Sequence, residues 1–200
     1  MSERVLLKEA RQKFQSGLKR LRGQRNLEQE EVAELLRQGG LPSFRTLDVG
    51  SWERGSLVPK WEEFLMLLRT YECSLGGFER ACRSEVPERE EGPPPSWASA
   101  RRLGSALRAL REREGWSPKR LVERLRDNIR MTGEKLERWE SGDLLIAMGR
   151  LLLSLAVMGL DFEDLEAELA RQGASLECRA EAAGRRRVRS YDALLIEPGA

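Results

Sequence analysis

The 200-residue sequence has no histidine, only three cysteines and almost no net charge. Without histidine there is no imidazole for acid–base catalysis at neutral pH, and none to ligate a metal. The cysteines, Cys73, Cys82 and Cys178, are widely spaced and odd in number. This excludes a zinc pattern or a disulfide framework and favours a reducing, cytoplasmic setting. Lys and Arg number 35 against 33 Asp and Glu, so any basic patch must be local.

Long apolar runs are also missing. The most apolar stretch, Leu144 to Leu160, is interrupted by Arg150 and is short for a bilayer span, so it predicts a buried helix. The charged N-terminal sequence MSERVLLKEARQKF lacks the apolar core of a signal peptide. The sequence has no Gly-rich phosphate loop and no metal-ligand motif. We therefore expect a protein that is not an enzyme, carries no cofactor or metal and does not enter a membrane.

The remaining pattern is helical, because no window alternates as a strand would and β-branched residues are sparse. The segment SEVPEREEGPPPS is rich in proline and acids, which is typical of a linker, and GRRRVRS marks a second break. The sequence thus predicts an all-α fold of two tandem five-helix domains. The expected division is a first domain at 1–83, a Pro/Glu-rich linker at 84–96, a second domain at 97–175 and a basic tail at 176–200.

The two halves of the chain repeat one another. LKRLRGQRNLEQEEVAELLR (18–37) aligns with LRALREREGWSPKRLVERLR (107–126) at an offset of 89 residues. The offset then becomes 87, and the Trp-Glu-x-Gly step at Trp52 falls on the same step at Trp139. One shared step after two shared helices indicates a duplication.

Each repeat is expected to hold five short helices. In the first repeat, glutamates crowd the start of the second helix, as the helix dipole favours, and residues 39–42 (GGLP) end it. Ser43 is the expected cap of a third helix that ends at Gly55. Pro59 then begins a fourth helix.

This order resembles the phage-repressor/Cro type of helix-turn-helix, the xenobiotic-response-element family of regulators. The first repeat carries the resemblance through Arg22, LEQEEVA with Gln29 and Ala33, WERG, Pro59 and LGGFER. The second, divergent repeat carries it through Arg111, WSPKRLV, WESG and MGLDFEDLEAEL. The resemblance implies a transcriptional regulator of the repressor type that binds double-stranded DNA. The third helix would enter the major groove, and the start of the second would lie on the phosphates.

By position, the resemblance implies two sets of DNA-binding candidates. Those of the first repeat are Gln29, Arg45, Thr46, Ser51, Arg54 and Lys60. Those of the second repeat are Lys119, Arg120, Thr132, Lys135 and Arg138. Arginine suits guanine edges, and lysine or threonine readily reaches phosphate.

The resemblance also implies two structural ion pairs, Arg22 with Glu53 and Arg111 with Glu140. A partly buried carboxylate at the end of the third helix needs such a partner. Trp52 and Trp139 are expected to anchor the third helices in the core.

A second function class stays open: a helix-turn-helix-derived protein-interaction module that no longer binds DNA. The turn before the third helix is longer than in the family pattern. The third helices also carry acids that phosphate repels, namely Asp48, Glu134 and Glu137. The segment Leu144 to Leu160 needs a second surface to bury it, which the first repeat, the tail, a partner protein or a second copy in a homodimer would supply.

The duplication also suggests how DNA would be bound. One chain could place two third helices in successive major grooves, about 34 Å apart, without a dimer. The repeats differ at their groove-facing positions, as in Ser51 against Arg138. We therefore expect an asymmetric site of two unlike half-sites.

Overall fold

The computed structural model describes residues 3–39, 41, 43–85, 100–126, 129 and 131–173, with the backbone alone at 3–7 and 100. Within these ranges every regular element is a helix, which confirms the all-α fold class. The first half holds α1 (Glu3–Gln24), α2 (Gln29–Gln38), α3 (Thr46–Arg54), α4 (Trp61–Thr70) and α5 (Leu75–Cys82). The second half holds α6 (Ala100–Arg113), α7 (Pro118–Arg126), α8 (Gly133–Ser141), α9 (Met148–Met158) and a C-terminal helix over residues 162–173. Most of the predicted linker (86–96) and all of the predicted tail (176–200) lie outside the described residues.

The third helix of each half is bounded by local chemistry. The expected cap at Ser43 is wrong, because α3 begins later, after Arg45. The carboxylate of Asp48 accepts a hydrogen bond from the Arg45 backbone N–H at 3.0 Å, which satisfies the helix start there instead. Both third helices end at a left-handed glycine, Gly55 with φ of 74° and Gly142 with φ of 79°.

The sequence predicted that the apolar segment Leu144 to Leu160 is one buried helix, and this prediction is wrong in its bounds. Residues 144–147 precede α9 without helical structure, and α9 ends at Gly159, whose φ is 76°. The expectation that this segment needs a surface beyond its own repeat is confirmed. The helix packs against α7 on one side and against α1 of the first half on the other. The sequence left open which surface buries this segment, and the structure shows that the first half does so.

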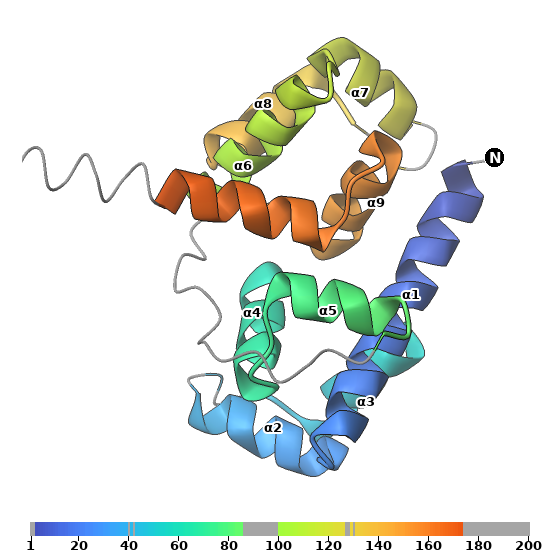
Figure 1. The fold of residues 1–200 in the computed structure, drawn as a ribbon, viewed down its shortest axis with the longest axis vertical. Coiled ribbons are helices and arrows are strands. Elements are labelled where there is room, and N and C mark those ends of the chain that lie inside the picture. The colour runs from blue at the N-terminus through green and yellow to red at the C-terminus, as the bar shows by residue number, and fades with distance from the viewer. Residues whose placement is uncertain are drawn as a thin grey trace, which may run out of the picture.

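The two halves share one hydrophobic core (Figure 1). Phe162, the first residue of the C-terminal helix, has its ring centre 5.5 Å from those of both Phe64 and Phe78. These two rings also pack on Phe14 of α1. A side chain of the second half therefore completes an aromatic cluster of the first, and the halves are packed together rather than merely strung along the chain.

The contact between α5 and the C-terminal helix is reciprocal. Glu166 accepts hydrogen bonds from the backbone N–H groups of Leu75 at 3.1 Å and Gly76 at 2.9 Å, at the start of α5. Glu79 on α5 accepts one from the backbone N–H of Phe162 at 3.4 Å. Glu79 and Glu166 are 87 residues apart, as are Leu75 and Phe162. Each helix thus caps the start of the other, as in the self-complementary interface of a twofold dimer.

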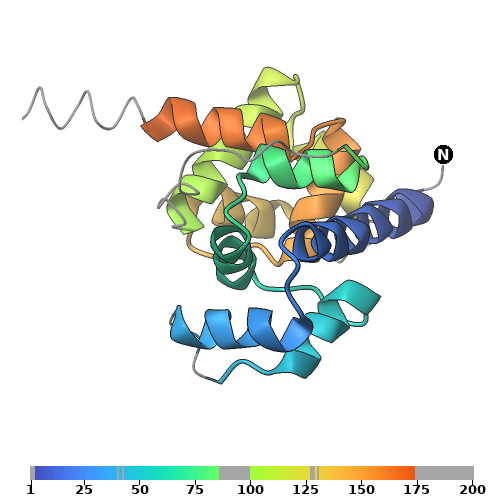
Figure 2. The same cartoon turned by 60° about the horizontal axis from the view of Figure 1, so that its bottom comes forward.

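This packing places the two third helices on one side of the molecule. In Figure 1, α3 lies behind α1 and α8 lies behind α6, whereas α5 and the C-terminal helix lie in front. Figure 2 turns the bottom of that view forward, and α2 and α3 then form a layer below α5 and the C-terminal helix. The interface between the halves therefore leaves α3 and α8 uncovered.

Candidate nucleic-acid interface

An ion pair joins α1 to α3 in the first half. Arg22 donates from Nε to Glu53 Oε1 at 2.7 Å and from Nη2 to Glu53 Oε2 at 3.2 Å. Its Nη1 donates to the carbonyl oxygen of Leu27 at 2.8 Å. The hydrogen bond to Glu53, whose side chain is only 2% exposed, is the main cause that raises the pKa of Arg22. The buried carboxylate is thus fully paired, and the end of α3 is fixed to α1.

The second half repeats this arrangement with shorter contacts. Arg111 Nε lies 2.6 Å from Glu140 Oε1, and Nη2 lies 2.9 Å from Glu140 Oε2. Arg111 Nη1 donates to the carbonyl oxygen of Trp116 at 2.8 Å, at the position equivalent to Leu27. Both predicted ion pairs are therefore present, and Trp52 and Trp139 are buried beside them. We call each Arg–Glu pair a lock.

The outward face of each third helix is a stripe of three side chains four and three positions apart, which share one helix face. In α3 these are Leu47, Ser51 and Arg54. In α8 they are Glu134, Arg138 and Ser141, at the same offset of 87 residues. All are exposed except Ser51, which is half-buried. These two stripes are the surfaces that face outward and are free to contact the major groove of a DNA duplex.

Gln29, the predicted phosphate contact of the first half, lies at the start of α2 and belongs to the lock. Its Nε2 donates to Glu53 Oε2 at 2.7 Å, which leaves its carbonyl oxygen available. Arg54 is exposed and folds across Gly50, because a Cβ built on that glycine would lie 2.8 Å from Arg54 Nη1 and 3.1 Å from Gln29 Oε1. The absence of a side chain at Gly50 thus makes room for the side chains of Arg54 and Gln29.

The other candidates of the first half surround the two ends of α3. Arg45 is the N-terminal cap and its side chain is 72% exposed. Thr46 follows it and is half-buried, and the hydroxyl of Ser51 donates to the carbonyl oxygen of Leu47 at 2.7 Å. Lys60 precedes α4, and its side chain is 78% exposed. Arg45 and Lys60 are therefore the accessible cations that flank the stripe.

All five candidates of the second half are exposed: Lys119, Arg120, Thr132, Lys135 and Arg138. The guanidinium of Arg120 lies over the ring of Trp116, 4.1 Å from its centre, at the start of α7. The hydroxyl of Thr132 caps α8 by accepting a hydrogen bond from the Lys135 backbone N–H at 3.3 Å. That hydroxyl is thus partly occupied, whereas the side chains of Lys135 and Arg138 project freely into solvent.

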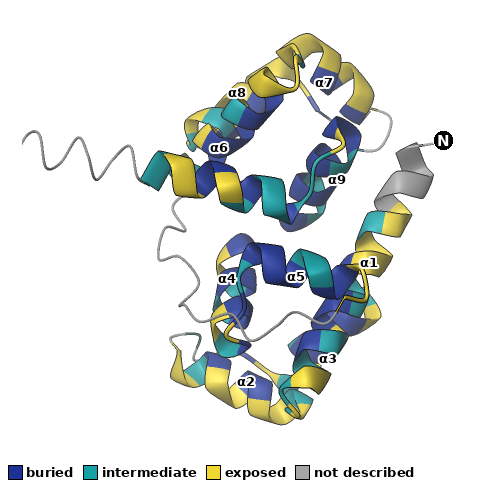
Figure 3. Cartoon of the chain, viewed as in Figure 1, coloured by how far each residue is buried: buried dark blue, intermediate teal, exposed yellow. Residues whose placement is uncertain are grey.

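The second helices of the two halves differ in charge. The exposed residues at the start and along the outer face of α2 include Glu28, Glu30, Glu31 and Glu34. The exposed residues of α7 include Lys119, Arg120, Arg124 and Arg126. In Figure 3 the outer faces of α2 and α7 are both exposed. Since phosphates attract the second set and repel the first, the α7 end is the more favourable one for a polyanion.

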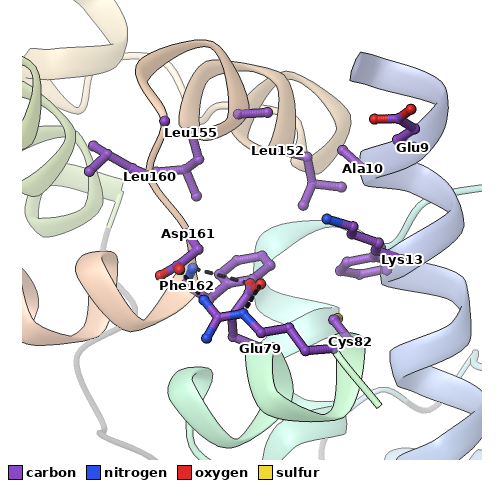
Figure 4. A pocket seen from close by; sticks show the side chains of 14 residues that line it. Glu9, Ala10, Lys13, Glu79, Cys82, Leu152, Leu155, Leu160, Asp161 and Phe162 are labelled. Atoms are coloured by element: carbon purple, nitrogen blue, oxygen red, sulfur yellow. Dashed lines mark hydrogen bonds and ion pairs between the residues drawn. The ribbon is translucent and has the colours of Figure 1, made fainter. Parts of the chain in front are cut away.

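One cavity, of about 380 Å³, lies at the junction of the two halves (Figure 4). Its apolar wall includes Leu152 and Leu155 from α9, and its floor includes Glu79 and Asp161. Arg83 forms ion pairs with both of these acids. These ion pairs at the floor therefore join α5 and the residue after it to the start of the C-terminal helix. Burial raises the pKa of the Cys82 thiol at its edge, which keeps that thiol unreactive.

Sequence reasoning did not single out Leu47, which is 67% exposed on α3, or Leu57, which is 56% exposed just after it. The signal was available, because Leu47 lies four positions before Ser51 and five before the buried Trp52, on the face opposite the core. The acids that join the halves, Glu79 and Glu166, carried no such signal, because their partners lie far away in the sequence.

No family model, no curated protein and no solved structure matches this chain. In the part of the chain that the structure describes, no group of three or more acidic or cysteine side chains is placed to hold a metal ion. No helix in the same part is both long and apolar enough to cross a membrane.

Proposed function

We propose that the chain is a transcriptional regulator that binds duplex DNA through α3 and α8, as two helix-turn-helix heads within a single chain. One observation carries this proposal: two copies of the same lock hold two equivalent exposed helices on the same side of the molecule. A twofold repressor achieves that arrangement with two subunits. Here the reciprocal contact between α5 and the C-terminal helix takes the place of the dimer interface.

The lock supports this function by fixing orientation. A helix that reads base edges must enter the groove at a set angle, and small displacements break hydrogen bonds. Bidentate pairing to Arg22 or Arg111 fixes the end of each third helix, while the buried tryptophan beside it fixes its depth. The two stripes are therefore presented rigidly.

Cations at the edges of the stripes support contact with phosphate. In the first half these are Arg45 and Lys60, and in the second they are Lys119 and Arg120 at the start of α7. Such contacts position a protein on the duplex and make its affinity depend on salt.

The test is fluorescence anisotropy with labelled fragments of the source genome at two salt concentrations. We expect affinity to fall steeply as salt rises, and Arg45→Ala and Lys135→Ala each to weaken binding. Arg171→Ala is the matched control, because Arg171 lies on the C-terminal helix, in front of the molecule in Figure 1. Binding that is absent, or that is insensitive to both substitutions, would refute the proposal.

The alternative is a protein-interaction module, and a specific observation favours it. The exposed large apolar side chains of the described residues are Leu35, Leu47 and Leu57, all in the first half. Leu47 lies on α3 and Leu57 just after it, and exposed apolar side chains that lie together are also typical of a docking surface. This reading predicts that Leu47→Ser abolishes capture of a partner protein, while the salt-dependent binding of DNA is absent from the outset.

A further inference from the structure

We propose that the two heads read half-sites of different base composition: α3 meets a thymine methyl group through Leu47, and α8 reads C·G pairs through Glu134 and Arg138. This inference rests on the proposed function and adds the composition of each half-site to it. It follows from comparing equivalent positions of two helices held in the same way.

The equivalence of positions is set by contacts in both halves. At the same offset of 87 residues, Trp52 and Trp139 are buried and Gly55 and Gly142 end the helix in the left-handed conformation. Leu47 and Glu134 therefore occupy the same place on the outward face. One helix presents a hydrocarbon side chain where the other presents a carboxylate.

In α3, the acid that follows the first residue of the outward face is engaged in capping. Asp48 accepts a hydrogen bond from the Arg45 backbone at 3.0 Å and lies 3.6 Å from the Arg45 guanidinium. Leu47 beside it projects into solvent. An apolar side chain at the start of a reading helix fits the C5-methyl group of thymine, the apolar feature of the major groove. The first head is thus suited to a T·A pair at this position.

In α8, the cap leaves the acid free. The hydroxyl of Thr132 caps the helix, so Glu134 is not needed there. Glu134 and Arg138 are both exposed and lie four positions apart, on one face of the helix. A carboxylate accepts from cytosine N4, and a guanidinium donates to guanine O6 and N7. The second head is thus suited to C·G pairs.

A perfect palindrome offers the same bases to both heads and so suits only one of them. The preferred operator should hold one half-site with thymine at the Leu47 position and one with cytosine and guanine at the Glu134 and Arg138 positions. Discrimination at each position should be on the order of tenfold, the usual effect of one good base contact.

The test is repeated selection from a random duplex library with the full chain, followed by affinities for the enriched sites. Leu47→Glu makes the two helices alike at this position, so its selected sites should lose the thymine preference in one half-site only and become more symmetric. Glu134→Leu should change the other half-site only. Both positions are exposed, and thermal unfolding followed by circular dichroism checks that each variant remains folded.

Two results overturn the inference and are distinguishable. If all three proteins enrich specific DNA but the sites are palindromic, or if both variants change the same half-site, the assignment of half-sites is wrong while DNA binding stands. If the wild-type chain enriches no sequence and shows no salt-dependent binding to any duplex, the proposed function itself fails and the inference fails with it.

Discussion

At the scale of single residues, the lock explains why the Trp-Glu-x-Gly step is written twice. The tryptophan lies in the core, the glutamate pairs with an arginine of the first helix, and the glycine ends the helix in a conformation that other residues avoid. In the second half the two side chains are only 5% and 8% exposed, so the pair is largely removed from water. The two charges compensate each other, because burying either one alone would destabilise the fold.

Glu140→Gln should therefore destabilise the fold by about 3 kcal/mol, since it leaves the guanidinium of Arg111 buried without its counter-charge. Urea unfolding measures the change, and Glu62→Gln on the exposed face of α4 is the control. If Glu140→Gln lowers the free energy of unfolding by no more than Glu62→Gln does, the ion pair does not stabilise the fold.

Gly104 shows a second residue-scale constraint, the close approach of α6 to α8. A Cβ built there would lie 2.0 Å from the carbonyl oxygen of Trp139 and 2.9 Å from that of Glu140. These are backbone atoms that cannot turn aside, so Gly104→Ala should push the helices apart and lower the thermal midpoint strongly. Gly133→Ala, where a Cβ meets nothing within 4 Å, should be neutral or stabilise by up to about 1 kcal/mol. Equal effects of the two substitutions in thermal unfolding would contradict the close approach.

At the scale of elements, the reciprocal caps hold the two halves in one arrangement. Burial, the largest cause, raises the pKa of Glu79 above its ordinary 4.5, although the hydrogen bond from Phe162 and the charge of Arg83 oppose the shift. A raised pKa means that the folded state holds this proton more tightly than the unfolded chain does. The stability that this group contributes is full below pH 4.5 and is lost as pH rises through the raised pKa.

The wild-type protein should therefore gain stability relative to Glu79→Gln as the pH falls from 7 to about 4. Urea unfolding of both proteins at the two pH values measures the difference. A difference that does not depend on pH would show that Glu79 titrates alike in the folded and unfolded states.

The opposite charges of α7 and α2 predict that substitutions in these two helices change DNA binding in different ways. Because α7 carries exposed cations at its start, Lys119→Ala should lower the slope of log affinity against log salt by about one unit. In the first half, Glu30→Gln on α2 should raise affinity, because it removes a charge that phosphate repels. Anisotropy titrations at four salt concentrations measure both effects. Unchanged slopes for Lys119→Ala would place α7 away from the phosphates.

At the scale of the whole molecule, the helical class and the glycine stops were accessible from short-range spacing in the sequence, whereas the locks, which join residues 31 and 29 positions apart, were expected only from the family resemblance. The packing of the halves was not accessible from the sequence. Glu166 caps α5 across 91 positions of sequence, from Leu75, and Phe162 enters an aromatic cluster that begins at Phe14. Pattern and spacing do not encode which distant surface a helix meets. The exposed Leu47 was overlooked for another reason, because a leucine in a helix is usually core.

If one chain places two reading helices on one face of DNA, hydroxyl-radical footprinting of a selected site will show both of them. We predict two protected patches about one helical turn apart, close to 34 Å. Arg45→Ala should lose the patch at one end and Lys135→Ala the patch at the other. A single protected patch, or one patch lost in both variants, would contradict this arrangement and leave only one half of the molecule as a DNA-binding head.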